Sequence, residues 1–144
     1  MVEPRGGTPT RVPGGSGRVP TASPVGDVIA VARSDNDHPT LHFLTPAGTA
    51  SRAPLPIEPI GLPEGLAWSP DGRRIALVNL PGRAAAEVWV LTLADGALRK
   101  LAQFEAPVEL DGVTWTGDGR ALLAGRITYE TEVLLLRGLP VSRR

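Results

Sequence analysis

A segment that recurs at a nearly constant spacing is the feature that most constrains this chain. Residues 66–78 read LAWSPDGRRIALV, and residues 113–125 read VTWTGDGRALLAG. Both contain an apolar residue, a small residue, a Trp, a hydroxyl residue, Asp-Gly-Arg and an apolar run. Trp68 and Trp115 are therefore equivalent and lie 47 residues apart. Each copy of such a repeat is expected to form the same supersecondary unit.

Further matches extend the repeat to three copies. The segment EVWVL at 87–91 recurs as EVLLL at 132–136, which is 45 residues later. A more divergent copy comes first: SPVGDVIAV at 23–31 precedes SPDGRRIAL at 69–77 by 46 residues, and LHFLT at 41–45 precedes VWVLT at 88–92 by 47. A period of 45 to 47 residues lies in the range of β-propeller blades.

Each copy also has the pattern of antiparallel strands. Asp71-Gly72 and Asp118-Gly119 predict hairpin turns, because Gly accepts a positive φ and Asp bonds its own backbone. Continuous apolar runs predict strands that are buried on both faces, as in blades packed between two other blades. These runs are 75–78, 88–91 and 133–136, and the more polar run 98–102 predicts an outer strand.

One competing interpretation is a helix over residues 84–101, which are rich in helix formers. Gly96 interrupts that segment, and the β-branched residues Val88, Val90 and Thr92 favour a strand. The equivalent segment 132–136 has no helical surroundings. We therefore predict an all-β fold of about three β-propeller-type blades of antiparallel strands, as a partial or open propeller.

The middle copy closely resembles the repeat of TolB-type propellers, also called WD40-like or PD40 repeats. That motif reads Trp/Phe-Ser-Pro-Asp-Gly-Lys/Arg-x-Ile/Leu-Ala, followed later by an acidic residue and an apolar strand. The third copy departs from it at Gly117, and the first departs at Val25 and lacks the Trp. The resemblance covers roughly residues 20–140 and implies four-stranded blades. It marks structural motif positions, namely Trp68, Ser69, Pro70, Asp71, Gly72, Trp115, Asp118 and Gly119.

Residues 1–20 are dominated by Gly, Pro, Ser and Thr and predict a disordered leader. The predicted repeats then occupy residues 21–60, 61–107 and 108–144, with the third one incomplete. The smallest ring of about four blades would need roughly 190 residues at this period. The 144 residues here are too few. We expect a portion of a longer propeller, a protomer that closes a ring by association, or an open stack whose exposed blade face self-associates.

Composition excludes several classes of function. The formal net charge is zero and the 15 basic residues are scattered, so there is no electrostatic basis for binding nucleic acid. The absence of Cys excludes disulfides and thiol chemistry. No apolar run approaches the roughly 20 residues that span a membrane, and the first residues lack the apolar region of a signal peptide. If the chain is part of a longer protein, the family resemblance is compatible with a periplasmic or extracytoplasmic location. The chain itself does not specify the compartment.

No group of residues predicts a metal site. His38 and His42 fall at the start of a predicted strand, where four residues span about 13 Å, too far to share an ion. Surface imidazoles are the expected outcome. The Asp35-Asn36-Asp37 run lacks the Gly and Glu of a calcium loop and predicts a polar hairpin.

No group of residues predicts catalysis or a cofactor either. No Gly-x-Ser-x-Gly elbow is present, and the serines before Pro24 and Pro70 belong to repeat turns. The segment 117–119 begins a dinucleotide-like pattern but leads into a strand. Glu130 and Glu132 are expected to be solvated. The three Trp residues fit packing between blades.

The predicted function is therefore a non-catalytic scaffold or protein–protein interaction module that binds no cofactor or nucleic acid. The contacts are expected from the blade-end loops 33–40, 79–87 and 126–132. One alternative is the propeller portion of a prolyl-oligopeptidase-like hydrolase, which the family resemblance implies and which would gate access of substrate. A second alternative is small-ligand or sugar binding by an assembled propeller.

Overall fold

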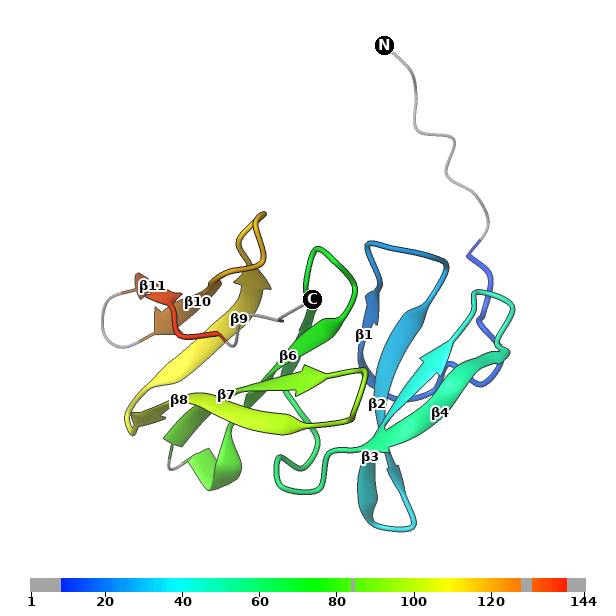
Figure 1. Cartoon of the computed structure of the whole chain (residues 1–144). Coiled ribbons are helices and arrows are strands. Elements are labelled where there is room, and N and C mark those ends of the chain that lie inside the picture. Colours follow the sequence, from blue (N-terminus) through cyan, green and yellow to red (C-terminus); the bar gives the residue numbers. More distant parts are fainter. Residues whose placement is uncertain (1–8, 84, 128–130, 140–144) are drawn as a thin grey trace.

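The predicted all-β fold is confirmed by the computed structural model, which describes residues 9–83, 85–127 and 131–139. The described residues form eleven strands in three antiparallel sheets, which lie side by side like the blades of a propeller (Figure 1). The helical residues among them are a single 3-10 turn, η1 (Pro81–Arg83). Each sheet corresponds to one copy of the sequence repeat.

The first sheet has four strands in the order β1-β2-β3-β4. They are β1 (Arg18–Ala22), β2 (Ile29–Asp35), β3 (His38–Leu44) and β4 (Ala50–Pro56). Asn36 and Asp37 both have positive φ, at 50° and 66°, and form the two-residue turn between β2 and β3. Short polar side chains tolerate that conformation. The polar hairpin predicted here is confirmed.

The second sheet has the order β5-β6-β7-β8. Its strands are β5 (Gly65–Trp68), β6 (Arg74–Asn79), β7 (Ala85–Thr92) and β8 (Leu98–Glu105). The helix considered for residues 84–101 does not form, because β7 pairs along its length with both β6 and β8. The outer strand predicted at 98–102 is confirmed as part of β8.

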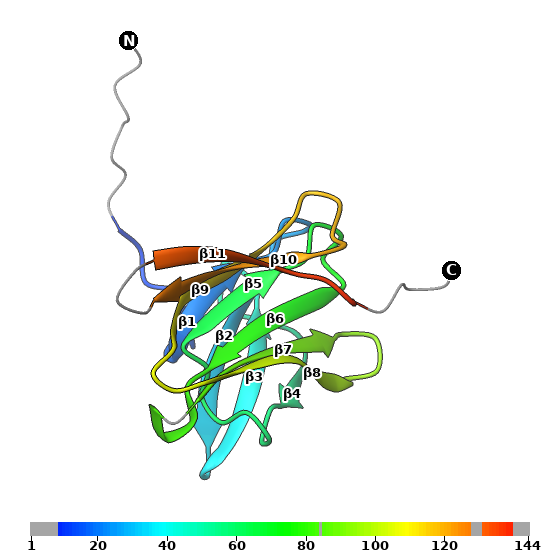
Figure 2. The ribbon, with the colours of Figure 1, turned by 90° about the vertical axis from the view of Figure 1, so that its left-hand side faces the viewer.

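The third sheet has three described strands in the order β11-β10-β9. They are β9 (Glu109–Trp115), β10 (Leu122–Ile127) and β11 (Thr131–Leu136). Where the first two sheets have a fourth strand, the third ends at β11 within the described residues. Figure 2 looks onto this sheet, with β11 and β10 in front of the others.

The three sheets share one pairing register. Near the start of the second strand of each sheet, an aliphatic residue pairs with a Leu near the end of the third strand, giving the pairs Ile29–Leu44, Ile75–Leu91 and Leu122–Leu136. Gly72 and Gly119 both have φ of 68° in the turns before the second strands, as the Asp-Gly pattern predicts. A residue in one sheet can therefore be assigned its counterpart in the other two.

Two apolar clusters join the sheets. Between the first and second sheets, Ala30, Ala32, Leu41 and Phe43 pack against Ile75, Leu77, Leu91 and Leu93. Between the second and third sheets, Ala76, Val78, Val88 and Val90 pack against Leu110, Trp115, Leu122 and Ala124. The faces of the second sheet are therefore both covered, which explains why β6 is buried along its whole length.

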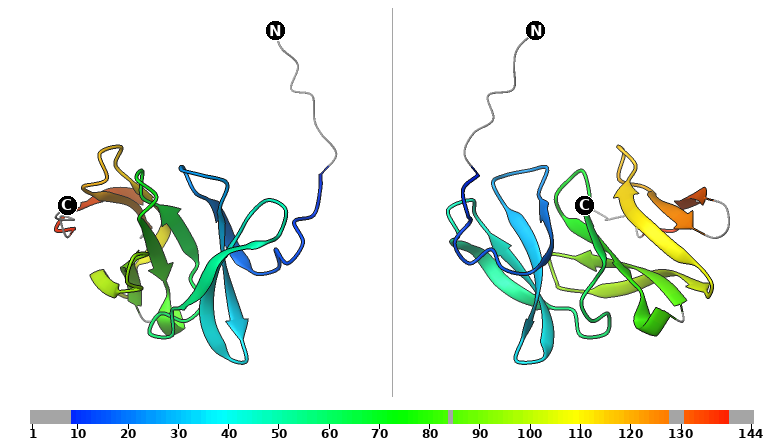
Figure 3. Two further views of the ribbon diagram at one scale, coloured as in Figure 1. Left: turned by 45° about the vertical axis from the view of Figure 1, so that its right-hand side comes forward. Right: turned by 180° about the vertical axis from the view of Figure 1, so that it is seen from behind.

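Residues 9–17 pack on the side of the first sheet that faces away from the second sheet (Figures 1 and 3). Gly17 leaves so little room that a Cβ atom there would lie 2.5 Å from the Cγ2 atom of Val31. Val31 on β2 is 1% exposed, although no sheet lies on that side of it. The leader expected at residues 1–20 thus contributes residues 9–17 to the packing and 18–20 to β1, while residues 1–8 lie outside the described residues.

A search of the described residues for a membrane-spanning helix finds none that is long and apolar enough.

Candidate functional site

The motif residues form the same hydrogen-bonded turn in the second and third sheets. The Ser69 hydroxyl donates to Asp71 Oδ1 at 2.6 Å, and the same carboxylate oxygen accepts from the Arg73 amide at 3.0 Å. Thr116 and Asp118 repeat both bonds at 2.6 and 3.0 Å, the second from the Arg120 amide. Hydroxyl and carboxylate therefore hold the loop that leads into the second strand.

These bonds also affect the titration of the third-sheet carboxylate. The hydrogen bond from the Thr116 hydroxyl, followed by that from the Arg120 amide, lowers the pKa of Asp118 below its ordinary value. In the first sheet, Val25 stands where the Asp is expected, and the Ser23 hydroxyl donates to the Val25 carbonyl at 2.7 Å. A related turn thus forms without a carboxylate.

The two equivalent Trp side chains join neighbouring sheets. Trp68 donates its indole N–H to the carbonyl of Thr21 on β1 at 3.2 Å, and Trp115 donates to the carbonyl of Ala67 on β5 at 2.9 Å. Thr21 and Ala67 hold the same position in the register, opposite Ala30 and Ala76. Each Trp therefore marks the place where one sheet attaches to the preceding one.

Each indole ring also packs against the preceding sheet. The Trp68 ring meets the Phe43 ring edge-on, with ring centroids 6.1 Å apart. The Arg74 guanidinium lies 4.6 Å from the centroid of the Trp115 ring and donates to the Gly119 carbonyl at 2.9 Å. Aromatic and cation–π contacts of this kind stabilise a buried interface beyond the area that they cover.

The third sheet has one face that no described residue covers. We call it the open face and define it by Leu123, Gly125, Val133 and Leu135, which alternate with the residues that pack on the second sheet. Val133 is 74% exposed and Leu135 is 46% exposed. Their counterparts in the second sheet, Val88 and Val90, are 0% and 4% exposed.

The prediction that the apolar run 133–136 is buried on both faces is therefore wrong for the third sheet. The run is apolar for the same reason as 88–91, but the sheet that would cover its second face is missing from the described chain. An exposed apolar sheet surface next to an unpaired edge strand is typical of an interaction surface.

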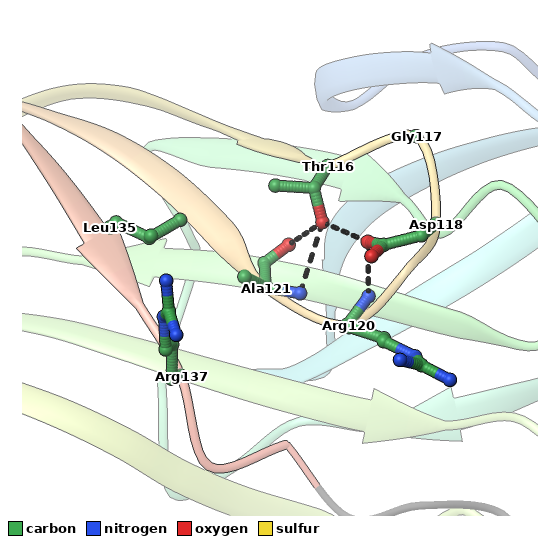
Figure 4. A pocket seen from close by; sticks show the side chains of 7 residues that line it. All are labelled: Thr116, Gly117, Asp118, Arg120, Ala121, Leu135 and Arg137. Atoms are coloured by element: carbon green, nitrogen blue, oxygen red, sulfur yellow. Dashed lines mark hydrogen bonds between the residues drawn. The ribbon is translucent and has the colours of Figure 1, made fainter.

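The open face continues into a hollow of about 430 Å³ beside the motif turn (Figure 4). Its lining consists of Thr116, Gly117, Asp118, Arg120, Ala121, Leu135 and Arg137. Figure 4 shows Leu135 and Arg137 on one side and the turn that carries Asp118 on the other. The hollow combines the aliphatic side chain of Leu135 with the carboxylate of Asp118 and the guanidinium groups of Arg120 and Arg137.

The two histidines bind different carboxylates. His38 Nδ1 lies 2.7 Å from Glu58 Oε1, and His42 Nε2 lies 2.5 Å from Asp35 Oδ2. His38 is at the surface as expected, whereas the side chain of His42 is only 17% exposed, because it lies along β3 beside Asp35. The hydrogen bond from His42 is the main cause of a lowered pKa of Asp35. No group of three or more metal-binding side chains occurs among the described residues.

The structure also places several other positions that the sequence analysis considered in strands or in loops between strands. Gly117–Gly119 lies in the loop between β9 and β10, as expected. Of the loops expected to make contacts, 33–40 is mostly strand around a two-residue turn, and 79–87 contains η1 and the start of β7. Glu130 lies outside the described residues, as does part of the loop 126–132, and Glu132 lies on β11.

Sequence reasoning missed one buried polar network. Glu87 accepts from Lys100 Nζ at 2.6 Å and from the Trp89 indole at 2.9 Å. Glu87 is 9% exposed. The position of Glu87 directly before the apolar run 88–91 was a signal for it, because a buried carboxylate needs a hydrogen-bond or charged partner.

Comparisons with known proteins agree on the fold. No protein-family model matches the chain, and no curated protein matches it. Among solved structures, TolB from Acinetobacter baumannii aligns with a TM-score of 0.59 at 15% identity, covering 83% of this chain and 31% of that one. The putative TolB from Agrobacterium tumefaciens aligns with 0.57 at 16% identity, covering 81% and 40%.

The β-propeller domain of the Trilobed protease from Pyrococcus furiosus aligns with a TM-score of 0.56 at 17% identity, covering 83% of this chain and 38% of that one. At these identities the similarity shows the fold alone, which is TolB-like. The chain spans less than half of the length of each of these three structures.

Proposed function

We propose that this chain is a non-catalytic β-propeller segment that acts as a scaffold or protein–protein interaction module within a larger propeller. The observation that carries the proposal is the open face. Val133 and Leu135 occupy positions that are buried by a neighbouring sheet in the two preceding blades. Leaving them in water costs roughly 25 cal/mol for each Å² of apolar surface, which a protein partner would recover.

The motif residues support a structural role. Ser69 is 0% exposed, and its hydroxyl donates to Asp71 within its own turn. Thr116 and Asp118 are engaged in the same way. A hydroxyl that is held by a carboxylate and has no imidazole partner described beside it differs from an activated nucleophile. Membership of the TolB-type repeat family, which the motif suggests, is part of the same proposal.

The proposal is tested by photo-crosslinking from the open face. Val133 is replaced by p-benzoyl-phenylalanine in the cell that produces the protein, and adducts are mapped by mass spectrometry. Val25 serves as the matched control, because it is an apolar side chain that is 50% exposed, in the turn between β1 and β2. We expect adducts with a defined protein segment from position 133 and not from position 25. Equal labelling from both positions would refute the open face as an interaction surface.

A second candidate is the propeller portion of a hydrolase that gates access of substrate. The structural similarity to the propeller domain of the Trilobed protease favours it, with a TM-score of 0.56. In the same experiment, this candidate predicts adducts with a polypeptide that also contains a Gly-x-Ser-x-Gly nucleophile elbow. Adducts with proteins that lack any hydrolase domain would exclude it.

A further inference from the structure

We propose that the open face binds a further β-propeller blade, and that a Trp of that blade lies over Leu135 and donates its indole N–H to the carbonyl of Thr114. The inference rests on the proposed function and specifies the partner. The occupant is defined by its chemistry: it is a propeller blade whose Trp supplies an indole ring and an N–H donor to the open face.

The first argument is the recurrence of the Trp hydrogen bond. Trp68 and Trp115 donate to residues that hold one register position in the preceding sheet, opposite Ala30 and Ala76 respectively. In the third sheet that position is Thr114, which pairs with Leu123. Ala30 and Ala76 face the following sheet, and their counterpart Leu123 lies on the face of the third sheet that no described sheet covers.

The second argument is the surface on which the indole ring lies. Phe43 packs edge-on against Trp68, and Val90, its counterpart in the second sheet, lies in one apolar cluster with Trp115. The counterpart in the third sheet is Leu135, opposite Leu123 just as Val90 is opposite Ala76. Leu135 is 46% exposed, so an aliphatic platform for an indole ring is present and unoccupied by the described chain.

The third argument is the hollow beside the motif turn. In the second sheet the equivalent turn touches the turn of the next blade: a Cβ atom on Gly119 would lie 3.6 Å from Pro70 Cδ. The counterpart of Pro70 is Gly117, which lines the hollow together with Arg137. Arg137 is exposed and can supply to the incoming indole the cation–π contact that Arg74 supplies to Trp115.

The first sheet of a second copy is not the occupant. Its outward face is already covered by residues 9–17, which bury Val31 to 1% exposure. That sheet also has Ala22, which pairs with Ile29, where the later sheets have Trp68 and Trp115. Two open faces from two copies would bring no Trp to either Thr114. The partner blade must therefore carry its own Trp.

The test extends the chain by one period. Arg137 is the counterpart of Thr92, so residues 1–137 are continued by a second copy of residues 93–144. The first part of this copy provides an outer strand for the third sheet, and the rest provides a further blade with an added copy of Trp115. We expect the added indole N–H to exchange with solvent at least about tenfold more slowly than that of free tryptophan, as measured by NMR.

The same spectra report the contact itself. The methyl signals of Leu135 should move upfield, because the indole ring lies over them. Leu135→Arg in the extended chain should abolish both effects, while Val25→Arg should leave them unchanged. A further blade whose own amides are protected while its added indole exchanges freely would overturn the proposal.

A second measurement uses the chain at its present length and avoids any dependence on the folding of the added blade. N-acetyl-tryptophanamide is titrated into the protein, with N-acetyl-alaninamide as control. The tryptophan probe should shift the Leu135 methyl signals and the Thr114 carbonyl signal more than any signal of the first sheet. Equal shifts at Leu135 and Val25 would overturn the proposal.

Failure of this inference and failure of the proposed function are distinguishable. Photo-adducts from position 133 with a protein that has no propeller blade would support an interaction module and overturn the Trp-bearing blade as its partner. Absence of specific adducts would instead contradict the interaction role, whatever the outcome of the NMR experiments.

Discussion

At the scale of residues, the attachment of one sheet to the next depends on a Trp with two functions. Trp115 is 7% exposed, its ring stacks under the Arg74 guanidinium, and its indole N–H donates to the Ala67 carbonyl. Packing and hydrogen bonding can be separated, because Phe retains most of the ring volume and lacks the donor.

We expect Trp115→Ala to lower the free energy of unfolding by about 3–5 kcal/mol, as for other buried aromatic residues. Trp115→Phe should cost about 1–3 kcal/mol, through the unpaired Ala67 carbonyl and the reduced contact with Arg74. Urea denaturation of both variants measures the two quantities. Equal losses for the two variants would contradict the expectation that ring packing and the indole hydrogen bond contribute separately to stability.

Two glycines with the same backbone angle should respond differently to substitution. Gly72 and Gly119 both have φ of 68°, so Ala at either position costs about 1 kcal/mol from the backbone. A Cβ atom on Gly72 would also lie 2.1 Å from Val25 Cγ2, whereas one on Gly119 would have ordinary contacts. Thermal unfolding should show the larger loss for Gly72→Ala, and Val25→Ala should recover only that excess.

At the scale of elements, the strands differ in how their polar groups are satisfied. β7 contains Glu87, which is 9% exposed and pairs with Lys100 on β8. The hydrogen bond from Lys100 lowers the pKa of Glu87 below its ordinary value of 4.5, assisted by the Trp89 indole and opposed by burial. The outer pair of strands in the second blade is thus joined by a carboxylate that must stay ionised.

Glu87→Gln should therefore remove a pH-dependent part of the stability. A carboxyl group whose pKa is lowered by folding stabilises the protein above its unfolded pKa, and this contribution is lost as the pH falls through the folded pKa. The difference in free energy of unfolding between the protein and Glu87→Gln should be largest near neutral pH and shrink below 4.5. As a control, Glu64→Gln removes an exposed ion pair with Arg18 and should have little effect.

At the scale of the whole molecule, the two outermost sheet faces differ in whether they are covered. Residues 9–17 cover the outward face of the first sheet, whereas the open face of the third sheet is left to solvent by the described chain (Figures 1 and 3). The molecule therefore has one closed end at the first sheet and one open end at the third sheet.

Removal of residues 1–17 should convert the closed end into a second exposed apolar surface. Val31 and Leu44, which are 1% and 6% exposed, would meet water. We expect a loss of about 1–3 kcal/mol in the free energy of unfolding and increased binding of a hydrophobic dye. Unchanged stability of the shortened protein would show that the segment does not contribute to the packing of the first sheet.

The sequence by itself determined the number of blades, the second and third strands of each, and the Asp-Gly turns that precede the second strands of the second and third blades. These features are local, because an Asp-Gly pair with a positive φ and the apolar runs on either side specify a hairpin and its register wherever it lies. Burial was not local. Runs 88–91 and 133–136 look alike, yet Val88 is 0% and Val133 is 74% exposed. Only the tertiary structure decided which sheet faces were covered, because each is covered by a segment that lies far away in the chain.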